Sequence, residues 1–159
     1  LTARDLLAGV VTLAVMGGMA WISQRLRSED ERRRLWVLGL LPRTFREGAP
    51  FVLLAALGAI SEELAYRGVT FALCTMLTGS AIAGALIAAL LFAVVHYPQG
   101  GKSMAVIFGI ALLKQALGVF TGTLWVAIGV HFTYNVLAAV GMARRAREAQ
   151  WPDALPPHD

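Results

Sequence analysis

Several side chains that could carry out acid–base and hydrolytic chemistry lie inside stretches of the sequence that are otherwise apolar. Glu62 and Glu63 are the only two of the ten acidic residues in such stretches, and Asn135 is the only asparagine in the chain. His96 and His131 also fall within apolar stretches. A charged group at the centre of a bilayer costs roughly 3 kcal/mol on insertion scales, so we expect these residues to be kept for pairing or for function.

Spacing along a helix predicts how some of these residues pair. Glu63 and Arg67 are four residues apart, which places them within about 40° of each other on one helix face, so we expect a structural ion pair. Glu62 points about 100° away from Glu63 and shares a face with Tyr66, whose hydroxyl could hydrogen-bond the carboxylate. We therefore expect Glu63 to be neutralised locally and Glu62 to serve a group on another helix.

Two further pairs have the same four-residue spacing. His131 and Asn135 share a helix face and present two hydrogen-bonding groups to one point, whereas Phe92 can pack beneath His96 and limit its rotamers. Lys114 lies near the middle of another apolar stretch and has no partner by spacing. We expect this lysine to extend toward the membrane surface or to meet a backbone carbonyl.

These residue types suit the hydrolysis of an amide bond. That reaction needs a base for water, donors for the developing oxyanion and an acid for the leaving amine, and a carboxylate in surroundings of low dielectric constant is suited to general base work. His131 and Asn135 could supply two oxyanion donors, each worth about 10²–10³ in rate. A Ser-His-Asp triad is not available, because all four aspartates lie outside the apolar stretches.

Five apolar stretches are long enough to position these residues in a membrane. A span needs about 20 apolar residues and must satisfy its own backbone hydrogen bonds, so each stretch is expected to be a helix. The sequence therefore predicts an all-α, polytopic transmembrane helix bundle, with any chemistry inside it. The five stretches are Leu6–Ser23, Phe51–Leu77, Ser80–Tyr97, Met104–Thr121 and Thr123–Met142.

Composition also indicates an integral membrane protein. The chain has 159 residues, of which 57% are hydrophobic and 15% charged, whereas soluble domains carry about a quarter charged residues. The single cysteine, Cys74, cannot form an internal disulfide. The net charge of +4 does not indicate nucleic-acid binding, because most of the basic residues lie in connections between the apolar stretches.

The positions of the basic residues orient the chain. The connection 24–50 holds seven arginines. The connections and the tail on this side of the predicted bundle together hold eleven basic residues, whereas the connections on the other side hold none. This asymmetry places the basic side in the cytoplasm, with Arg4 as the exception. Glu62 and His131 each lie 11 residues from a cytoplasmic end, about 17 Å along the helix, so they could meet. We expect a multi-pass protein of a bacterial cytoplasmic membrane with its site toward the cytoplasmic face.

Three motifs resemble those of the CPBP family of CAAX proteases and bacteriocin-processing enzymes, also called the ABI family. Glu62–Arg67 matches the EExxxR motif, Phe92–His96 matches FxxxH, and His131–Asn135 matches HxxxN, in order and each on its own predicted span. The resemblance covers about residues 50–142 and implies an intramembrane endopeptidase similar to the type II CAAX prenyl proteases. Members of this family commonly have more spans, so further helices before Leu1 are expected.

The resemblance also implies a role for each matching residue. Glu62 and His96 would activate a water molecule, and His131 with Asn135 would stabilise the oxyanion. The implied substrate is a membrane-associated peptide or lipidated protein, so substrate and membrane lipid are the expected partners, and the oligomeric state is left open. The residues expected to support the site are Glu63, Tyr66, Arg67 and Phe92.

The residues leave the participation of a metal open. Glu62, His96 and His131 would form the His₂Glu set of a catalytic zinc site, but the sequence has no HExxH motif. With Glu62 as a ligand, only Glu63 would be left as a base, and it is already paired. We therefore favour a glutamate-type mechanism without a cofactor, with a zinc-dependent protease as the alternative. Outside hydrolysis, the alternatives are a proton-coupled transporter and a catalytically silent bacteriocin-immunity or membrane scaffold protein.

Three parts are expected along the chain. Residues 1–49 would hold the first span and a basic connection, residues 50–143 a CPBP-like catalytic helix bundle, and residues 144–159 a basic, then proline-rich cytoplasmic tail. In the connection, the charged and apolar patches of Glu29–Leu41 predict an interfacial helix, with a mobile charged loop as an equally supported alternative. The end of the tail, Trp151–Asp159, is expected to be disordered.

Overall fold

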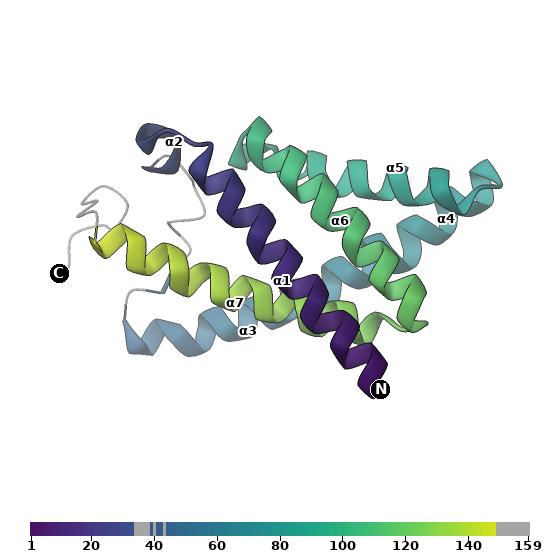
Figure 1. Ribbon diagram of the computed structural model, residues 1–159, viewed down its shortest axis with the longest axis horizontal. Helices are drawn as coiled ribbons and strands as arrows, with labels where there is room; N and C mark the ends of the chain where they lie inside the picture. The colour runs from purple at the N-terminus through teal and green to yellow at the C-terminus, as the bar shows by residue number, and fades with distance from the viewer. Residues whose placement is uncertain (34–38, 40, 43, 149–159) are drawn as a thin grey trace.

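The computed structural model describes residues 1–33, 39, 41–42 and 44–148, and this part of the chain is helical without any strand (Figure 1). The helices follow one another with short connections, apart from the basic connection between the second and third. In chain order they are α1 (Ala3–Arg25), α2 (Glu29–Arg33), α3 (Phe45–Glu62), η2 (Glu63–Thr70), α4 (Phe71–Thr78), α5 (Ala81–Val94), η3 (Tyr97–Gln99), α6 (Gly101–Thr121) and α7 (Leu124–Glu148).

Four helical stretches are long and apolar enough to cross a membrane, which confirms the predicted polytopic bundle. The sequence predicts five spans, but the third of them forms the 14-residue helix α5, which at 1.5 Å per residue is shorter than the hydrocarbon core. The predicted stretch ends early because the residue before Pro98 disfavours helical backbone, and Tyr97 begins the short 3₁₀ turn η3. The four stretches are Ala3–Arg25, Arg46–Thr78, Gly101–Thr121 and Leu124–Ala146.

The helix that holds both intramembrane glutamates begins before the predicted apolar stretch. The Thr44 hydroxyl accepts a hydrogen bond from the backbone N–H of Glu47 at 3.3 Å and caps α3, which starts at Phe45 and continues through Pro50. Pro50 is the sixth residue of the helix, so its missing N–H removes one bond from the helical ladder. The helical backbone then runs without a break through η2 and α4 to Thr78.

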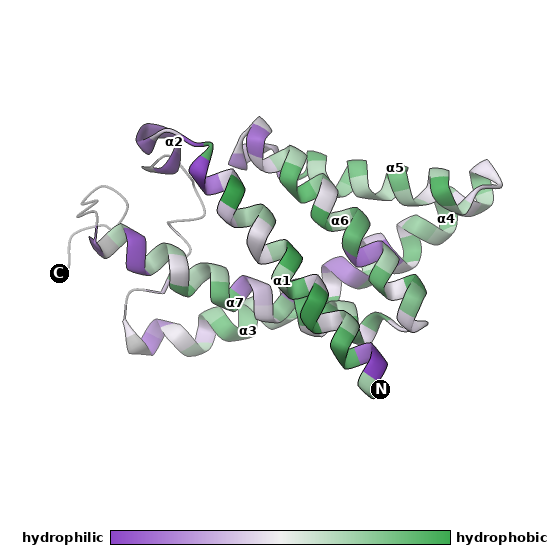
Figure 2. Cartoon of the chain, in the orientation of Figure 1, coloured by the Kyte–Doolittle hydropathy of each residue, from purple (hydrophilic) through white to green (hydrophobic). Residues whose placement is uncertain are grey.

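The helices pack so that the middle of this long helical stretch is enclosed. α1 crosses α6 and α7, α3 runs along α7, and α5 packs against α4 and α6 (Figure 1). η2 contacts both α5 and α7. Most of the bundle is hydrophobic, and hydrophilic residues gather at helix ends and in the centre (Figure 2). The buried apolar residues at the crossing of α1, α6 and α7 are Met16, Ile110, Leu117, Val126, Ala127 and Val130.

The contact between α4 and α5 depends on a small residue. Gly79 adopts a left-handed backbone (φ 67°) and ends α4, and Ser80 caps α5. Gly84 then lies against Thr75, so that a Cβ atom at Gly84 would come within 2.8 Å of the Thr75 backbone nitrogen. Small residues allow membrane helices to approach closely.

Gly84→Ala should therefore destabilise the bundle. The added methyl group meets backbone atoms, which cannot move aside as a flexible side chain can, so we expect a loss of about 1–3 kcal/mol of folding free energy. Thermal unfolding in detergent micelles measures this loss. Gly58→Ala is the matched control, because no heavy atom lies within 4 Å of that position. Equal melting temperatures for the two variants would contradict the close approach of α4 and α5.

The basic connection is described in part. α2 covers most of the predicted charge cluster, whereas the apolar patch expected in the interfacial helix lies almost wholly outside the described residues. Leu41, at the end of that patch, is buried against Ala139 and Ala146 of α7. The predicted disordered segment, Trp151–Asp159, also lies outside the described residues.

Candidate active site

The two neighbouring glutamates occupy the junction between α3 and η2. Glu62 is the last residue of α3 and Glu63 is the first of η2, an eight-residue π-helical segment that ends at Thr70. The spacing argument assumes regular α-helix here, but the structure widens the helix from Glu63 onward, over every residue of the EExxxR motif except the first. π-helical segments are rare and are frequently found at functional sites.

Glu63 is the centre of a fully buried ion cluster. Its side chain has no exposed surface, and one carboxylate oxygen lies 3.4 Å from Nε of Arg67, which confirms the predicted ion pair. The other oxygen, Oε1, lies 2.6 Å from Nζ of Lys114 and 2.7 Å from Nδ1 of His131. Buried charges are costly unless they are paired and hydrogen-bonded. The Glu63 carboxylate is paired through both oxygens and hydrogen-bonded through Oε1, whereas Oε2 has no hydrogen-bond partner among the described residues.

Lys114 is the site residue that the spacing argument misses. The expectation that it reaches the membrane surface or a backbone carbonyl is wrong, because its side chain is 1% exposed and is paired with Glu63. A spacing argument compares residues on one helix, whereas this pair joins α6 to η2. A charge count could have found it, since the predicted spans contain two acidic residues, Glu62 and Glu63, and two basic ones, Arg67 and Lys114.

The hydrogen bond to Glu63 fixes the tautomer of His131. An ionised carboxylate can only accept, so the hydrogen of this bond is on Nδ1, and Nε2 of the neutral ring presents a lone pair. Nε2 lies 3.7 Å from Oε2 of Glu62, whose side chain is 37% exposed. With a neutral His131, the charges of Glu62, Glu63, Arg67 and Lys114 sum to zero, as a low-dielectric site favours.

The Phe92 ring contacts residues of two other motifs as well as His96 of its own. Its ring lies 4.6 Å from the ring of His96 and 6.5 Å from that of His131, measured between centroids. The Arg67 guanidinium carbon lies 4.2 Å from the same centroid. This cation–π contact matters because neither Nη atom of Arg67 has a hydrogen-bond partner within the described chain. The expected support of the site by Phe92 is therefore broader than a contact with His96.

His96 lies just beyond the end of α5. Its Nδ1 donates a hydrogen bond to the backbone carbonyl of Phe92 at 2.7 Å, which leaves Nε2 as the free ring atom. In the described chain, neither ring nitrogen of His96 comes within ion-pair distance of Glu62, whereas His131 does. The imidazole beside Glu62 is thus the one on α7.

Tyr66 does not make the hydrogen bond to Glu62 that its spacing suggests. No hydrogen bond joins the Tyr66 hydroxyl to Glu62 in the part of the chain that the structure describes. The Tyr66 ring instead packs edge-on against Phe92, with centroids 5.0 Å apart.

Asn135 is half-buried on α7, one turn beyond His131. Its amide has no hydrogen-bond partner among the described residues.

The described side chains do not fit the zinc set considered from the sequence. Over residues 1–33, 39, 41–42 and 44–148, no three His, Cys, Asp or Glu side chains are grouped closely enough to hold a metal ion. We therefore derive no chemical step through a metal.

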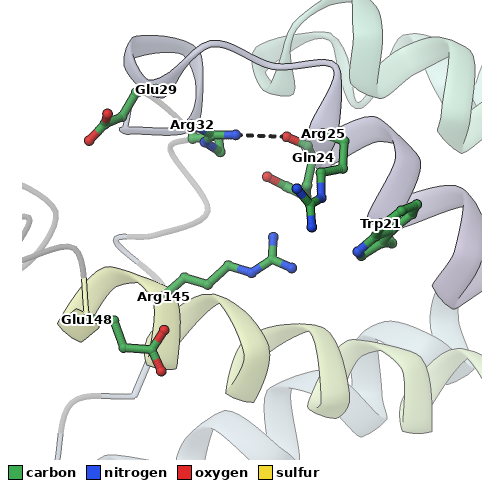
Figure 3. A pocket seen from close by; sticks show the side chains of 7 residues that line it. All are labelled: Trp21, Gln24, Arg25, Glu29, Arg32, Arg145 and Glu148. Carbon is green, nitrogen blue, oxygen red and sulfur yellow. Dashed lines mark hydrogen bonds between the residues drawn. The ribbon is translucent and has the colours of Figure 1, made fainter.

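Two cavities lie away from this cluster. One of about 490 Å³ lies between the ends of α1 and α7, where Arg25, Arg32 and Arg145 share its wall with Glu29 and Glu148 (Figure 3). Arg32 donates to the backbone carbonyl of Gln24 there at 3.0 Å. The second, of about 480 Å³, is a mostly apolar groove between α3 and α7. The lining of neither includes Glu62, His96, His131 or Asn135.

Comparison with known proteins gives one family. The sequence model of the Rce1-like family, described as type II CAAX prenyl endopeptidase Rce1-like, matches residues 45–137, more than half of the chain. The match includes all three motifs and Lys114. No curated protein and no solved structure shows significant similarity to the chain.

Proposed function

Because this chain belongs to the Rce1-like family of type II CAAX prenyl endopeptidases, we propose that it hydrolyses a peptide bond in a prenylated or otherwise lipidated substrate at the membrane. Family membership implies a peptidase. The four long apolar helices make it an integral membrane protein. The mechanism and the substrate are our proposal, argued from the residues around Glu62.

One observation carries the proposal, namely the approach of two acceptor atoms from different helices. Glu62 Oε2 and His131 Nε2 are 3.7 Å apart, too far for a direct hydrogen bond. The tautomer of His131 makes Nε2 an acceptor, and an ionised Glu62 can only accept. A water molecule that donates one hydrogen to each atom satisfies both. The exposed part of Glu62 leaves this position open to water and to a substrate.

In the proposed mechanism, Glu62 takes a proton from this water as the water oxygen attacks the peptide carbonyl carbon. The Asn135 amide donates to the oxyanion that forms, and the proton then passes to the leaving nitrogen as the C–N bond breaks. We assign His131 as the hydrogen-bond acceptor that positions the water, since its Nε2 carries no hydrogen in the resting site. His96, the partner of Glu62 expected from the family motifs, remains a second candidate through its free Nε2.

Peptide cleavage in liposomes tests this function. The purified protein is incubated with a peptide that carries a farnesylated cysteine near its C-terminus, and with the same peptide without the lipid. We expect release of the residues after the cysteine from the farnesylated peptide. The proposal fails if neither peptide is cleaved, or if His131→Ala cleaves as fast as the unmodified protein. Proton flux that persists without cleavage would instead support a transporter.

Asn135→Ala should slow cleavage while the substrate still binds. The asparagine amide would donate to the oxyanion and not to the ground-state peptide, so we expect kcat to fall by about 10²–10³ with little change in KM. Steady-state kinetics with the farnesylated peptide measure both. Gln115→Ala on α6 is a matched loss of a buried amide outside the proposed site. A similar loss of kcat in both variants would contradict the oxyanion role.

We propose that the reaction needs no metal, and chelation tests this. Zn²⁺ binding requires several ligands directed at one point, and the described His and Glu side chains are not grouped in that way. Dialysis against a strong zinc chelator should leave the rate of peptide cleavage unchanged. A loss of activity that added Zn²⁺ restores, together with one zinc per chain by metal analysis, would reverse this prediction.

We also propose a membrane location and binding partners for the protein. The basic connections on one side of the bundle favour a cytoplasmic location for the ends of α1 and α7, which we propose for a bacterial cytoplasmic membrane. The mostly apolar groove between α3 and α7 suits a lipid chain, so membrane lipid and a lipidated peptide are the proposed partners.

A further inference from the structure

The geometry points to Lys114 as a positioning residue for the reaction, an inference that rests on the proposed function. Its ammonium group holds Glu63 in the ionised state in which that carboxylate accepts the Nδ1–H of His131. The result is that His131 Nε2 keeps its lone pair for the water beside Glu62. Lys114 lies on α6, a helix that contributes none of the motif residues.

The first support is that one oxygen atom of Glu63 accepts hydrogen bonds from both Lys114 and His131. Glu63 Oε1 accepts from Lys114 Nζ at 2.6 Å and from His131 Nδ1 at 2.7 Å. Arg67 lies nearest the other oxygen, at 3.4 Å. The lysine is therefore the cation in closest contact with the oxygen that orients the imidazole, and charge-assisted bonds of this length are strong.

The second support is the set of charges around His131. Glu62 on α3 and Glu63 on η2 lie next to His131. Arg67 on η2 and Lys114 on α6 do not contact it directly, but both pair with Glu63. α5 presents the apolar ring of Phe92, whose centroid lies 6.5 Å from that of His131 and 4.6 Å from that of His96. α1 packs on α7 through Gly9 and Met16, which do not titrate. Lys114 thus supplies one of the two positive charges that balance two carboxylates.

Removal of the ammonium group leaves this cluster with one uncompensated negative charge, which a proton can neutralise in two ways. If Glu63 takes the proton, its hydroxyl donates to Nδ1, and the hydrogen of the ring moves to Nε2. If His131 takes it, the imidazolium carries hydrogens on both nitrogens. Either way Nε2 bears a hydrogen and cannot accept from the water.

Lys114→Met tests the inference by kinetics. Because the lysine does not touch substrate, we expect kcat for the farnesylated peptide to fall by about 10²–10³ while KM changes little. Raising the pH removes the extra proton, so part of the activity should return in alkaline buffer. Lys102→Met is the matched control on the same helix; its side chain is 53% exposed and pairs with Glu31, and its kinetics should equal those of the unmodified protein. Lys114→Arg, which keeps the charge, should retain more activity than Lys114→Met.

The tautomer of His131 gives a readout that needs neither substrate nor activity. The chain has three histidines, so ¹⁵N-histidine spectra can be assigned with His96→Gln and His158→Gln. We expect His131 to carry hydrogen on Nδ1 alone in the unmodified protein, and on Nε2 in Lys114→Met.

The outcomes separate this inference from the proposed function. An Nε2–H tautomer in the unmodified protein overturns the role of Lys114 even if Lys114→Met fails to fold. So does an unchanged pH profile with an unchanged spectrum in a folded Lys114→Met. If the unmodified protein cleaves no peptide but the tautomer changes as expected, the proposed function fails and the positioning of His131 by Lys114 stands.

Discussion

Glu62→Gln lowers kcat/KM for a farnesylated peptide by about 10³-fold or more and leaves the bundle folded. The amide cannot take a proton from water, and general base catalysis contributes about 10²–10⁴ in rate. The fold should survive because the Glu62 side chain is 37% exposed and lies 3.7 Å from its nearest ionic partner. Cleavage assays and thermal unfolding, carried out on the same preparation, measure the two effects.

Glu148→Gln is the matched control for this substitution. Glu148 is exposed at the end of α7 and has no proposed role in the chemistry, so the same change there should leave both the rate and the melting temperature unaltered. Cleavage by Glu62→Gln at the rate of the control would remove Glu62 from the mechanism. Loss of the fold in Glu62→Gln would show that this carboxylate is structural.

Glu63→Gln produces the opposite phenotype one residue away, with a large loss of stability. Glu63 is completely buried and neutralises the two cations Arg67 and Lys114. Removal of one partner from a buried ion pair leaves uncompensated charge and costs about 3–5 kcal/mol. We expect a much lower melting temperature in detergent, or failure to accumulate as a folded protein in the membrane.

A double substitution and an exposed control make this prediction specific. Lys114→Met combined with Glu63→Gln leaves one buried cation fewer than Glu63→Gln alone, so the double variant should recover part of the lost stability. Glu31→Gln removes a carboxylate that also pairs with a lysine, but at an exposed position, and should leave the melting temperature unchanged. Equal stability of Glu63→Gln and the unmodified protein would mean that the buried cluster does not hold the helices together.

Much of the fold follows from local properties of the sequence. Runs of apolar residues must form helices in a membrane, because only helices satisfy every backbone group within one segment. The ends of some elements have local signals that the span prediction did not use, since Thr44 is a capping residue and Pro98 limits the helix before it, whereas the predicted start at Ser80 coincides with the cap of α5. The length of α5 was overestimated because apolar composition alone does not reveal where the backbone leaves the helix.

The local geometry of the motif was less predictable. The sequence offers no signal that the helix widens over Glu63–Thr70, and the structure has a π-helical segment there. The pairing of Glu63 with Arg67 was nevertheless predicted correctly, since residues four apart stay close together on one helix. The expected hydrogen bond between Tyr66 and Glu62 failed, because Tyr66 packs on Phe92 of another helix.

The amino-acid sequence by itself determined which polar residues enter the membrane and which of them pair within one helix. Those properties depend on composition and on the fixed repeat of the helix. The tertiary structure alone decided that Lys114 and His131 share one oxygen of Glu63, and that Glu62 faces the other nitrogen of that imidazole. Contacts between helices depend on how each helix is rotated and where it crosses its neighbours. Side-chain packing across the whole bundle sets both, so the spacing within any single helix cannot reveal them.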